Sequence, residues 1–322
     1  MSTAPESQFD LLVHRMTWEA EGVLSVELVH PEGKPLAAWE AGAHIDVHAG
    51  DHIRQYSLCG DPGDVGRYRI GVLDEPSSRG GSRHLHTQVR PGDTLTVKGP
   101  RNHFALVEAE SYLFIAGGIG ITPILAQAKE AGAHGRPWRL WHGGRRRASM
   151  AFGDELLELV AEERAVTFHP LDEHGHLDLG HILAQAGPAT HIYCCGPEPL
   201  LVAVEEKCAE LGLRDRLHVE RFAAVEVAAP QGGELGFEVE CRRSGRTLQV
   251  GPEESIVEAL EDAGIPIETS CREGVCGTCE TAVLDGIPDH RDMVLTADEQ
   301  DAGDAMMLCV SRCSSGRLVL DV

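Results

Sequence analysis

Three cysteines lie close together in the stretch SCREGVCGTCE. They are Cys271, Cys276 and Cys279, and their spacing is C-x4-C-x2-C. Four thiolates around iron and sulfide need a loop that wraps the cluster and donates backbone N–H groups to its sulfurs. Gly274 and Gly277 suit the tight curvature of such a loop, because glycine reaches backbone angles that other residues avoid. The spacing, with a distant fourth cysteine, is that of plant-type [2Fe–2S] sites, so the sequence predicts an iron–sulfur cluster here.

The fourth ligand must come from the stretch MMLCVSRCSSG, which holds the two cysteines downstream of the cluster loop. Cys309 follows the apolar run MML, so a core strand could hold it rigidly beside the loop. Cys313 lies in a turn-like, polar stretch. We therefore predict Cys309 as the ligand. A zinc site would more naturally use two C-x2-C pairs, or Cys and His pairs, and only one C-x2-C is present.

Composition excludes several classes of protein. Hydrophobic residues make up 42% of the 322 and charged residues 25%, a balance typical of globular proteins with two or three domains at this length. The first residues, MSTAPESQFDLLVHRMTW, lack a basic segment followed by an apolar run. No apolar stretch approaches the roughly 20 residues of a membrane span. We expect no signal peptide, no membrane segment and a cytoplasmic protein, in which the ten cysteines stay reduced rather than forming disulfides.

The negative charge is large and uneven. A net charge of −23 argues against nucleic-acid binding, which needs a basic face. Residues 234–322 carry 19 Asp and Glu against 7 Arg and no Lys, a net charge of −12. This acidity is either a solvated surface that favours solubility or a docking face for a basic protein partner, and both interpretations stay open.

Hydrophobic patterning changes twice along the chain. Up to about Phe104, strand-like runs such as VLSVELV and DTLTVKG predict a small antiparallel barrel. From Tyr112, the strands YLFIAGG, RLWHGG and HIYCCGP alternate with helical segments, which predicts a parallel α/β domain of about five or six strands. AAVEVAAPQGG is linker-like. Beyond it, FEVECRRSGRTLQV predicts a hairpin, and Ser255 with Glu258 forms a capping box that opens a helix.

A glycine-rich turn follows the first strand of the predicted α/β domain, in YLFIAGGIGITPIL. Gly118-x-Gly120 lets the backbone approach a phosphate group, and Thr122 and Pro123 suit the N-cap and first turn of the next helix. This is G-x-G-x-x-P, not the dinucleotide fingerprint G-x-G-x-x-G. Alone it is a weak signal, because any strand–glycine–helix turn can look like it.

A second strand–glycine turn occurs in HIYCCGPEPLL. Cys195 falls at the carboxyl end of the strand, next to Gly196 and Pro197, where ligands of open α/β sheets bind. The neighbours of Cys194 alternate as in a buried strand, so we expect it to be an ordinary core residue.

One barrel strand carries three side chains that suit a flat phosphorylated ligand. In RQYSL, Arg54 could bind a phosphate, Tyr56 could stack on a ring and Ser57 could hydrogen-bond to the ring edge. Without other motifs this would be an ordinary amphipathic strand.

The motifs RQYSL, AGGIGITP and YCCGP, in this order, resemble those of the ferredoxin–NADP reductase superfamily of flavoproteins. SCREGVCGTC and LCVSR resemble plant-type ferredoxins of the β-grasp fold. Over essentially the whole chain, the sequence resembles the phthalate dioxygenase reductase family, which includes vanillate demethylase reductases. The resemblance implies a flavin barrel, a pyridine-nucleotide domain and a C-terminal ferredoxin. We predict the domains at residues 1–105, 106–225 and 234–322, with a linker at 226–233.

The resemblance also assigns roles to residues. It implies that Arg54 binds the flavin phosphate, Tyr56 covers the ring face and Ser57 meets the ring edge. HVERF implies that Phe222 covers the other ring face and moves aside for nicotinamide, although plain core packing would also explain this residue. LCVSR places the fourth cluster ligand at Cys309. The SRGGSRHLH stretch implies a phosphate-binding turn made of Arg79, Gly80, Gly81 and Ser82. The residues expected at the catalytic centre are Ser57, Cys195 and Phe222.

The cofactor pair follows from the same resemblance. Members of this family use FMN, and no obvious insertion is present to hold an adenosine half. In WHGGRRRASMAF, Arg145 and its two neighbouring arginines could meet the 2′-phosphate of NADPH. The family's usual donor is NADH, and we expect NADH here.

The resemblance implies a reductase component. NADH would give a hydride to FMN, the [2Fe–2S] centre would receive single electrons, and a Rieske-type oxygenase or demethylase acting on an aromatic or quaternary-amine compound would be the acceptor. We expect a monomer. One alternative keeps the enzyme but changes its acceptor to a diiron monooxygenase or a cytochrome P450. Another is a nucleotide-binding redox sensor, which no DNA-binding or regulatory pattern supports.

Overall fold

The computed structural model describes residues 8–50, 52–75, 80–159, 165–222 and 235–322. The chain divides into two compact units, Met1–Glu220 and Arg221–Val322. The predicted linker at 226–233 lies outside the described residues, and the predicted boundary at residue 105 stays a prediction. No helix within the described ranges is long and apolar enough to cross a lipid bilayer.

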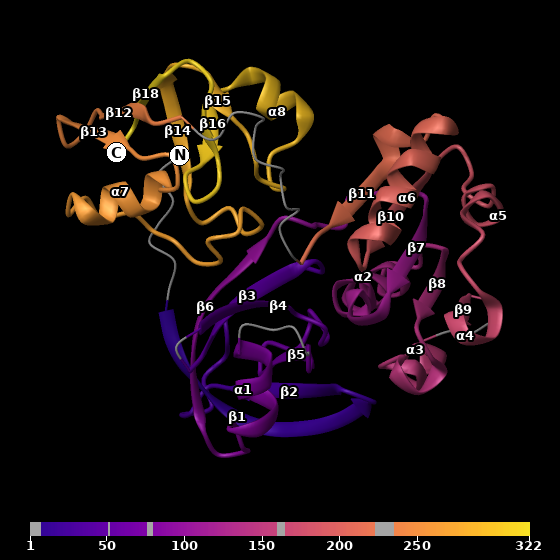
Figure 1. The fold of residues 1–322 in the computed structure, drawn as a ribbon. Helices are drawn as coiled ribbons and strands as arrows, with labels where there is room; N and C mark the ends of the chain where they lie inside the picture. Colours follow the sequence, from indigo (N-terminus) through magenta and orange to yellow (C-terminus); the bar gives the residue numbers. More distant parts are fainter. Residues whose placement is uncertain (1–7, 51, 76–79, 160–164, 223–234) are drawn as a thin grey trace. The chain divides into compact units, whose positions relative to one another are not determined.

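Six antiparallel strands form the first sheet of the unit Met1–Glu220, in the order β4-β3-β6-β1-β2-β5 (Figure 1). Leu58 forms a bridge with Ile70, and the Cys59 N–H donates to the Arg69 carbonyl at 2.8 Å. The two outer strands of the order therefore meet, which confirms the predicted antiparallel barrel. The strands are β1 (Gln8–Ala20), β2 (Val23–Val29), β3 (Ala43–Ala49), β4 (His52–Ser57), β5 (Tyr68–Leu73) and β6 (Thr94–Asn102).

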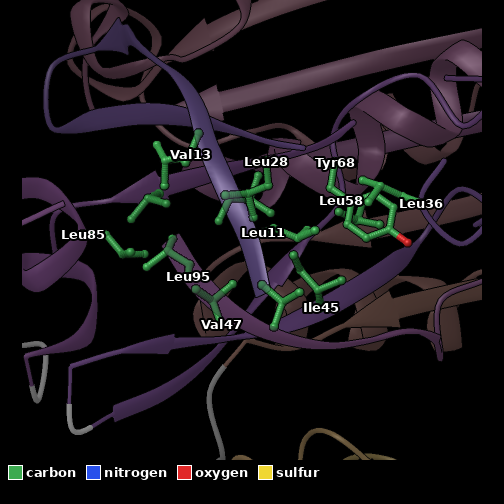
Figure 2. Packing of buried hydrophobic residues seen from close by; sticks show 14 of the residues in the cluster. Leu11, Val13, Leu28, Leu36, Ile45, Val47, Leu58, Tyr68, Leu85 and Leu95 are labelled. Carbon is green, nitrogen blue, oxygen red and sulfur yellow. The ribbon is translucent and has the colours of Figure 1, made fainter. Parts of the chain in front are cut away.

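The interior of this barrel is filled by the alternating apolar residues of its strands. Leu11 and Val13 of β1 point inward and are fully buried, as are Ile45 and Val47 of β3 (Figure 2). One short helix, α1 (Gly81–Thr87), packs on the barrel and adds Leu85 to the same cluster. The period-2 alternation of the sequence thus places one face of each strand in the core.

A five-stranded parallel sheet follows, in the order β11-β10-β7-β8-β9, which confirms the predicted α/β domain. Phe114 and Tyr193 pack with helix α2 on one face, while Ile115 and Cys194 pack with helix α6 on the other. Cys194 is thus a core residue, as expected. The strands are β7 (Ser111–Gly117), β8 (Trp138–Gly144), β9 (Val166–Pro170), β10 (Thr190–Cys195) and β11 (Leu217–Glu220). The helices are α2 (Ile121–Ala133), α3 (Gly153–Glu158), α4 (Leu171–His174), α5 (Leu179–Leu183) and α6 (Glu198–Glu210), with short 3-10 turns η1 (Gly118–Gly120), η2 (Arg147–Ser149) and η3 (Arg214–Arg216).

The unit Arg221–Val322 is an α+β fold with a five-stranded mixed sheet, in the order β13-β12-β18-β14-β16 (Figure 1). The predicted hairpin is formed by β12 and β13, and the predicted capping box is present, because Ser255 Oγ accepts from the Glu258 N–H and caps α7. The strands are β12 (Phe237–Cys241), β13 (Arg246–Val250), β14 (Glu280–Asp285), β15 (Pro288–Asp289), β16 (Ala305–Met307), β17 (Arg312–Cys313) and β18 (Arg317–Leu320), and the helices are α7 (Ile256–Asp262) and α8 (Ala297–Ala302).

Candidate functional site

The end of barrel strand β4 meets the carboxyl ends of two strands of the parallel sheet. Ser57 Oγ donates to Glu220 Oε2 at 3.4 Å, and the Cys195 thiol lies 3.9 Å from the same oxygen. Cys195 and Glu220 are register partners on β10 and β11. The structure therefore brings the predicted residues Ser57 and Cys195 to one carboxylate.

Sequence reasoning missed Glu220. Loss of solvent around its carboxyl raises the pKa to about 8, against the lowering effect of hydrogen bonds from Ser57 and Cys195. At neutral pH the group is therefore largely a neutral acid that can hold or release a proton. The signal in the sequence was the acidic residue within the motif HVERF, two residues before Phe222, but the partners of Glu220 are far away along the chain.

Strand β4 also carries Arg54, which lies against the first turn of α1. A Cβ at Gly81 would be 2.6 Å from Arg54 Cγ, and one at Gly80 would be 2.8 Å from His52 Nε2. Only glycine allows this approach at Gly80, whose φ is 116°. The structure thus brings Arg54, Gly80, Gly81 and Ser82 together, while Arg79 lies outside the described residues.

The donor set at this turn fits a phosphate group. Ser82 Oγ is buried and has no hydrogen-bond partner within the described ranges. An unpaired hydroxyl beside a guanidinium is what a bound anion would satisfy. Tyr56, two residues beyond Arg54, packs its half-buried ring against the barrel core, and burial raises the pKa of its phenol.

The turns after β7 and β10 touch each other through their backbones. A Cβ at Gly120 would lie 2.3 Å from the Cys195 carbonyl oxygen, and one at Gly196 would lie 3.0 Å from Gly117 Cα. Gly118 has φ 56° and faces open space. Only glycine at positions 120 and 196 therefore allows the two turns to touch. Gly118 leaves room for a ligand at the carboxyl edge of the sheet.

The prediction that Thr122 caps the following helix is wrong. Gly120 is the N-cap residue and α2 begins at Ile121, because the 3-10 turn Gly118–Gly120 already starts the helical path. Thr122 is buried in the first turn, and its Oγ1 donates to the Ile119 carbonyl at 3.0 Å. At the second turn, Pro197 is the N-cap residue of α6.

A buried histidine supports the first of these turns. His142 of β8 is fully buried, and its Nε2 lies 3.4 Å from the Gly118 carbonyl oxygen. Burial lowers the pKa of the imidazole to about 4, so the ring is neutral at physiological pH. A neutral ring with a protonated Nε2 can donate to that carbonyl, which holds Gly118 in place. This contact could not be predicted from the sequence, because a histidine in a strand is more often an ordinary core or surface residue.

The three arginines after β8 have different surroundings. Arg146 forms an ion pair with Glu21 at 2.5 Å, and the Arg147 guanidinium lies 4.0 Å from the centre of the Phe168 ring. Arg145 is exposed, and no side-chain partner of Arg145 occurs among the residues that the structure describes. Of the run, Arg145 is the arginine whose side chain is available to a ligand.

The cysteine loop has the curvature that the sequence predicts. Gly274 and Gly277 have φ of 70° and 74°. The Glu273 N–H donates to Cys271 Sγ at 3.2 Å, and the Thr278 N–H donates to Cys276 Sγ at 3.4 Å. Backbone N–H groups directed at sulfur stabilise thiolates, so the loop fits an anionic cluster.

The four predicted ligands are connected through their thiols. The neighbouring thiols of Cys276 and Cys309 hold the pKa of Cys271 well below that of a free thiol. Cys309 also bonds to Cys279 and lowers the pKa of that thiol. No described group of three or more His, Cys, Asp or Glu side chains is arranged to hold a single metal ion. The four thiols therefore lie together, as a cluster with four thiolate ligands requires.

Cys313 and Phe222 complete the set of predicted positions. Cys313 lies in the short strand β17, not in a turn, and its sulfur is 3.4 Å from Ser315 Oγ. The ring of Phe222 is 41% exposed, and its predicted place over a flavin stays a prediction.

Family models match both redox segments. Residues 227–314 match the 2Fe-2S iron-sulfur cluster binding domain, and residues 114–206 match the oxidoreductase NAD-binding domain. The chain is also 43% identical over 324 residues to phenoxybenzoate dioxygenase subunit beta of Ectopseudomonas oleovorans, covering 100% of this chain and 99% of the relative.

Solved structures give the same result. Phthalate dioxygenase reductase, described as a modular structure for electron transfer from pyridine nucleotides to [2Fe-2S], matches with a TM-score of 0.71 and 37% identity over 98% of both chains. An intact type IV self-sufficient cytochrome P450 monooxygenase matches with a TM-score of 0.90 and 42% identity, and this chain spans 41% of that one. The chain thus contains an NAD-binding domain and a 2Fe–2S cluster-binding domain.

Proposed function

The chain belongs to the phthalate dioxygenase reductase family of oxidoreductases, and from this premise we propose that it carries electrons from NADH, through FMN and a [2Fe–2S] cluster, to a separate Rieske-type terminal oxygenase. The contact of Ser57 and Cys195 with the same carboxylate, Glu220, is the observation that carries the proposal. It joins the flavin strand to the nucleotide strands, where a hydride would pass. We place the protein in the cytoplasm, where its cluster thiols remain reduced.

Bound FMN would accept a hydride and release its electrons singly, which the cluster needs. In the flavin half, Arg54 and the Ser82 hydroxyl would bind the phosphate, with Gly80 and Gly81 allowing close approach. The neutral ring of Tyr56 would cover one face of the flavin. A phosphate group of the flavin would satisfy the unpaired Ser82 Oγ.

In the nucleotide half, the open space at Gly118 would admit the diphosphate of NADH. Gly120 and Gly196 would keep the two turns in contact beside it. The hydrogen bond from Ser57 and the thiol of Cys195 would keep Glu220 directed at the reacting groups. Because its pKa is raised to about 8, Glu220 could hold the proton that the flavin takes up or loses.

The experiment that tests these assignments is cofactor analysis followed by a comparison of electron acceptors. The purified protein should release FMN on heating and contain iron and sulfide. NADH should reduce ferricyanide, which accepts electrons from the flavin, and cytochrome c, which takes them through the cluster. Release of FAD, or zinc in place of iron, would contradict the flavin or the cluster assignment. Steady turnover would exclude a redox sensor.

A cytochrome P450 is the second candidate acceptor, because the chain aligns with part of a self-sufficient P450 at a TM-score of 0.90. The two acceptors can be separated by co-purification from the native host and by reconstitution. A Rieske oxygenase that turns over with this protein and NADH would support the first candidate. Reduction of a P450 haem at a comparable rate, with no reduction of a Rieske centre, would support the second.

A further inference from the structure

Three charged side chains form a cluster between the barrel and the parallel α/β domain within the unit Met1–Glu220. Arg69 comes from β5, Lys129 from α2 and Glu155 from α3. Arg69 Nη2 lies 2.8 Å from both carboxylate oxygens of Glu155, and Lys129 Nζ lies 2.6 Å from Oε1. The three side chains are 17%, 15% and 28% exposed, so solvent screens these contacts only partly.

The same cations bind the backbone that follows the flavin strand. Arg69 Nη2 donates to the Cys59 carbonyl at 2.7 Å. Lys129 Nζ donates to the carbonyl oxygens of Cys59 and Gly60 at 3.3 Å and 3.2 Å. Ser57, which meets Glu220, lies only two residues before Cys59. The cluster therefore fixes the end of β4 to the helix that begins at the nucleotide turn.

Apolar contacts strengthen this junction. A Cβ at Gly71 of β5 would lie 2.6 Å from Thr122 Cγ2 and 3.2 Å from the Phe152 ring, so the strand lies directly on the first turn of α2. Phe152 has φ 61°, a conformation that strains a non-glycine residue, and its ring lies 5.4 Å below the Arg69 guanidinium. Surrounding structure must hold Phe152 in that conformation.

The carboxylate of Glu155 depends on both cations. Burial would raise the pKa of Glu155, but hydrogen bonds and charges from Arg69 and Lys129 outweigh burial and lower it. Removing one partner from such a group leaves charge without compensation and disturbs the local geometry. The cluster therefore acts as a unit, and losing one member should loosen the contact between β4 and α2.

We propose that Arg69, Lys129 and Glu155 are positioning residues, which hold the flavin-bearing strand and the nucleotide-binding helix at the separation that hydride transfer needs. The proposal rests on the proposed function. Hydride transfer needs reacting atoms about 3–3.5 Å apart, and a displacement of about 1 Å can cost on the order of 10²-fold in rate. None of the three side chains need touch either cofactor for this effect.

The test uses the full-length holoprotein and the variants Glu155→Gln and Lys129→Met. Each should lower the limiting rate of flavin reduction by NADH at least about 10-fold and weaken the long-wavelength charge-transfer absorbance between flavin and nicotinamide. The amount of bound flavin and the iron content should stay unchanged. Glu155→Asp, which keeps the charge, should recover part of both signals.

Glu108→Gln is the control, because Glu108 pairs with Arg136 at 3.0 Å on the surface and neither residue bonds to Arg69, Lys129 or Glu155. It should leave hydride transfer unchanged. If Glu155→Gln lowers the melting temperature but leaves both the limiting rate and the charge-transfer band at wild-type values, the residues are merely structural and the proposal is wrong.

Amide hydrogen exchange separates this proposal from the proposed function. Residues 58–60 and the first turn of α2 should exchange faster in Glu155→Gln than in the wild type, whether or not NADH is the donor. Unchanged exchange there would contradict the positioning role. A wild-type protein whose flavin NADH does not reduce would instead contradict the proposed function.

Discussion

Ser57 and Glu220 are 163 residues apart in the sequence, yet the Ser57 hydroxyl donates to the Glu220 carboxyl at 3.4 Å. The first residue ends a strand of the antiparallel barrel, and the second ends the edge strand β11 of the parallel sheet. The hydrogen bond between them brings the ends of two separate sheets together. Its geometry depends on how the two sheets are joined.

In the variant Glu220→Gln, the rate of flavin reduction should lose part of its pH dependence. Because the pKa of Glu220 is raised to about 8, the wild-type rate should change with an inflection near that pH. The amide cannot titrate, so the variant should show no inflection, and its rate should be lower by about 10²-fold, the usual size of an acid–base contribution. Stopped-flow absorbance between pH 6 and 10 measures both. If the variant keeps the inflection, a group other than Glu220 titrates in this pH range.

The same substitution should change how stability depends on pH. The folded protein keeps the Glu220 proton between the ordinary pKa of 4.5 and about 8, where the unfolded chain has lost it. Stability should therefore fall as pH rises through this window, and Glu220→Gln should have a shallower slope. Chemical denaturation at several pH values gives the comparison. Identical slopes would show that the Glu220 pKa is not raised.

Cys309→Ser should lose most of the iron and all cytochrome c reduction, while ferricyanide reduction by the flavin survives. The Cys309 thiol lowers the pKa of two thiols of the loop, whereas Cys313 lies on β17 beside Ser315. Cys313→Ser is therefore the matched control and should keep its cluster and its activity. Iron analysis with the reverse pattern would show that the ligand assignment is wrong.

Arg145→Gln should change the choice of nucleotide more than the rate. An exposed guanidinium after β8 would bind the 2′-phosphate of NADPH, so the variant's ratio of kcat/KM for NADPH to that for NADH should fall about 10-fold. Arg146→Gln is the control, since Arg146 is paired with Glu21. Equal ratios in the Arg145 variant and the wild type would mean that this side chain does not meet the nucleotide.

Salt should slow delivery of electrons to the oxygenase more than it slows flavin reduction. Residues 234–322 carry a net charge of −12, and the attraction to a basic partner is screened as the Debye length falls from about 10 Å at 0.1 M to about 3 Å at 1 M. Rates of both steps, measured over this range with the native oxygenase, test the docking interpretation. Equal salt sensitivity would favour a surface that only aids solubility.

Much of the fold was predictable because its signals are local. The three loop cysteines lie within nine residues, and the capping box of α7 needs only Ser255 and Glu258. The two strands of the β12–β13 hairpin are joined by a short turn. Strand–helix alternation predicted the parallel sheet for the same reason. In each case the interacting residues are neighbours in the chain, so their spacing carries the information.

The parts that were missed depend on contacts between distant segments. Glu220 gains its raised pKa from burial against groups that only the folded chain assembles, and Thr122 lost its expected cap position to the preceding 3-10 turn. The Arg69–Glu155 pair links positions 86 residues apart. No local pattern distinguishes these side chains from ordinary surface charges.

The pairing of β12 with β18 has a consequence for biosynthesis. These strands are parallel neighbours, and β18 lies between β12 and β14 in the sheet. A nascent chain that has not yet reached Arg317 cannot complete the sheet that supports Cys279 and Cys309. Long-range parallel pairing is slow to form, so iron delivery should follow release of this segment from the ribosome. The barrel and parallel α/β sheet, complete by Glu220, could fold and take up flavin earlier.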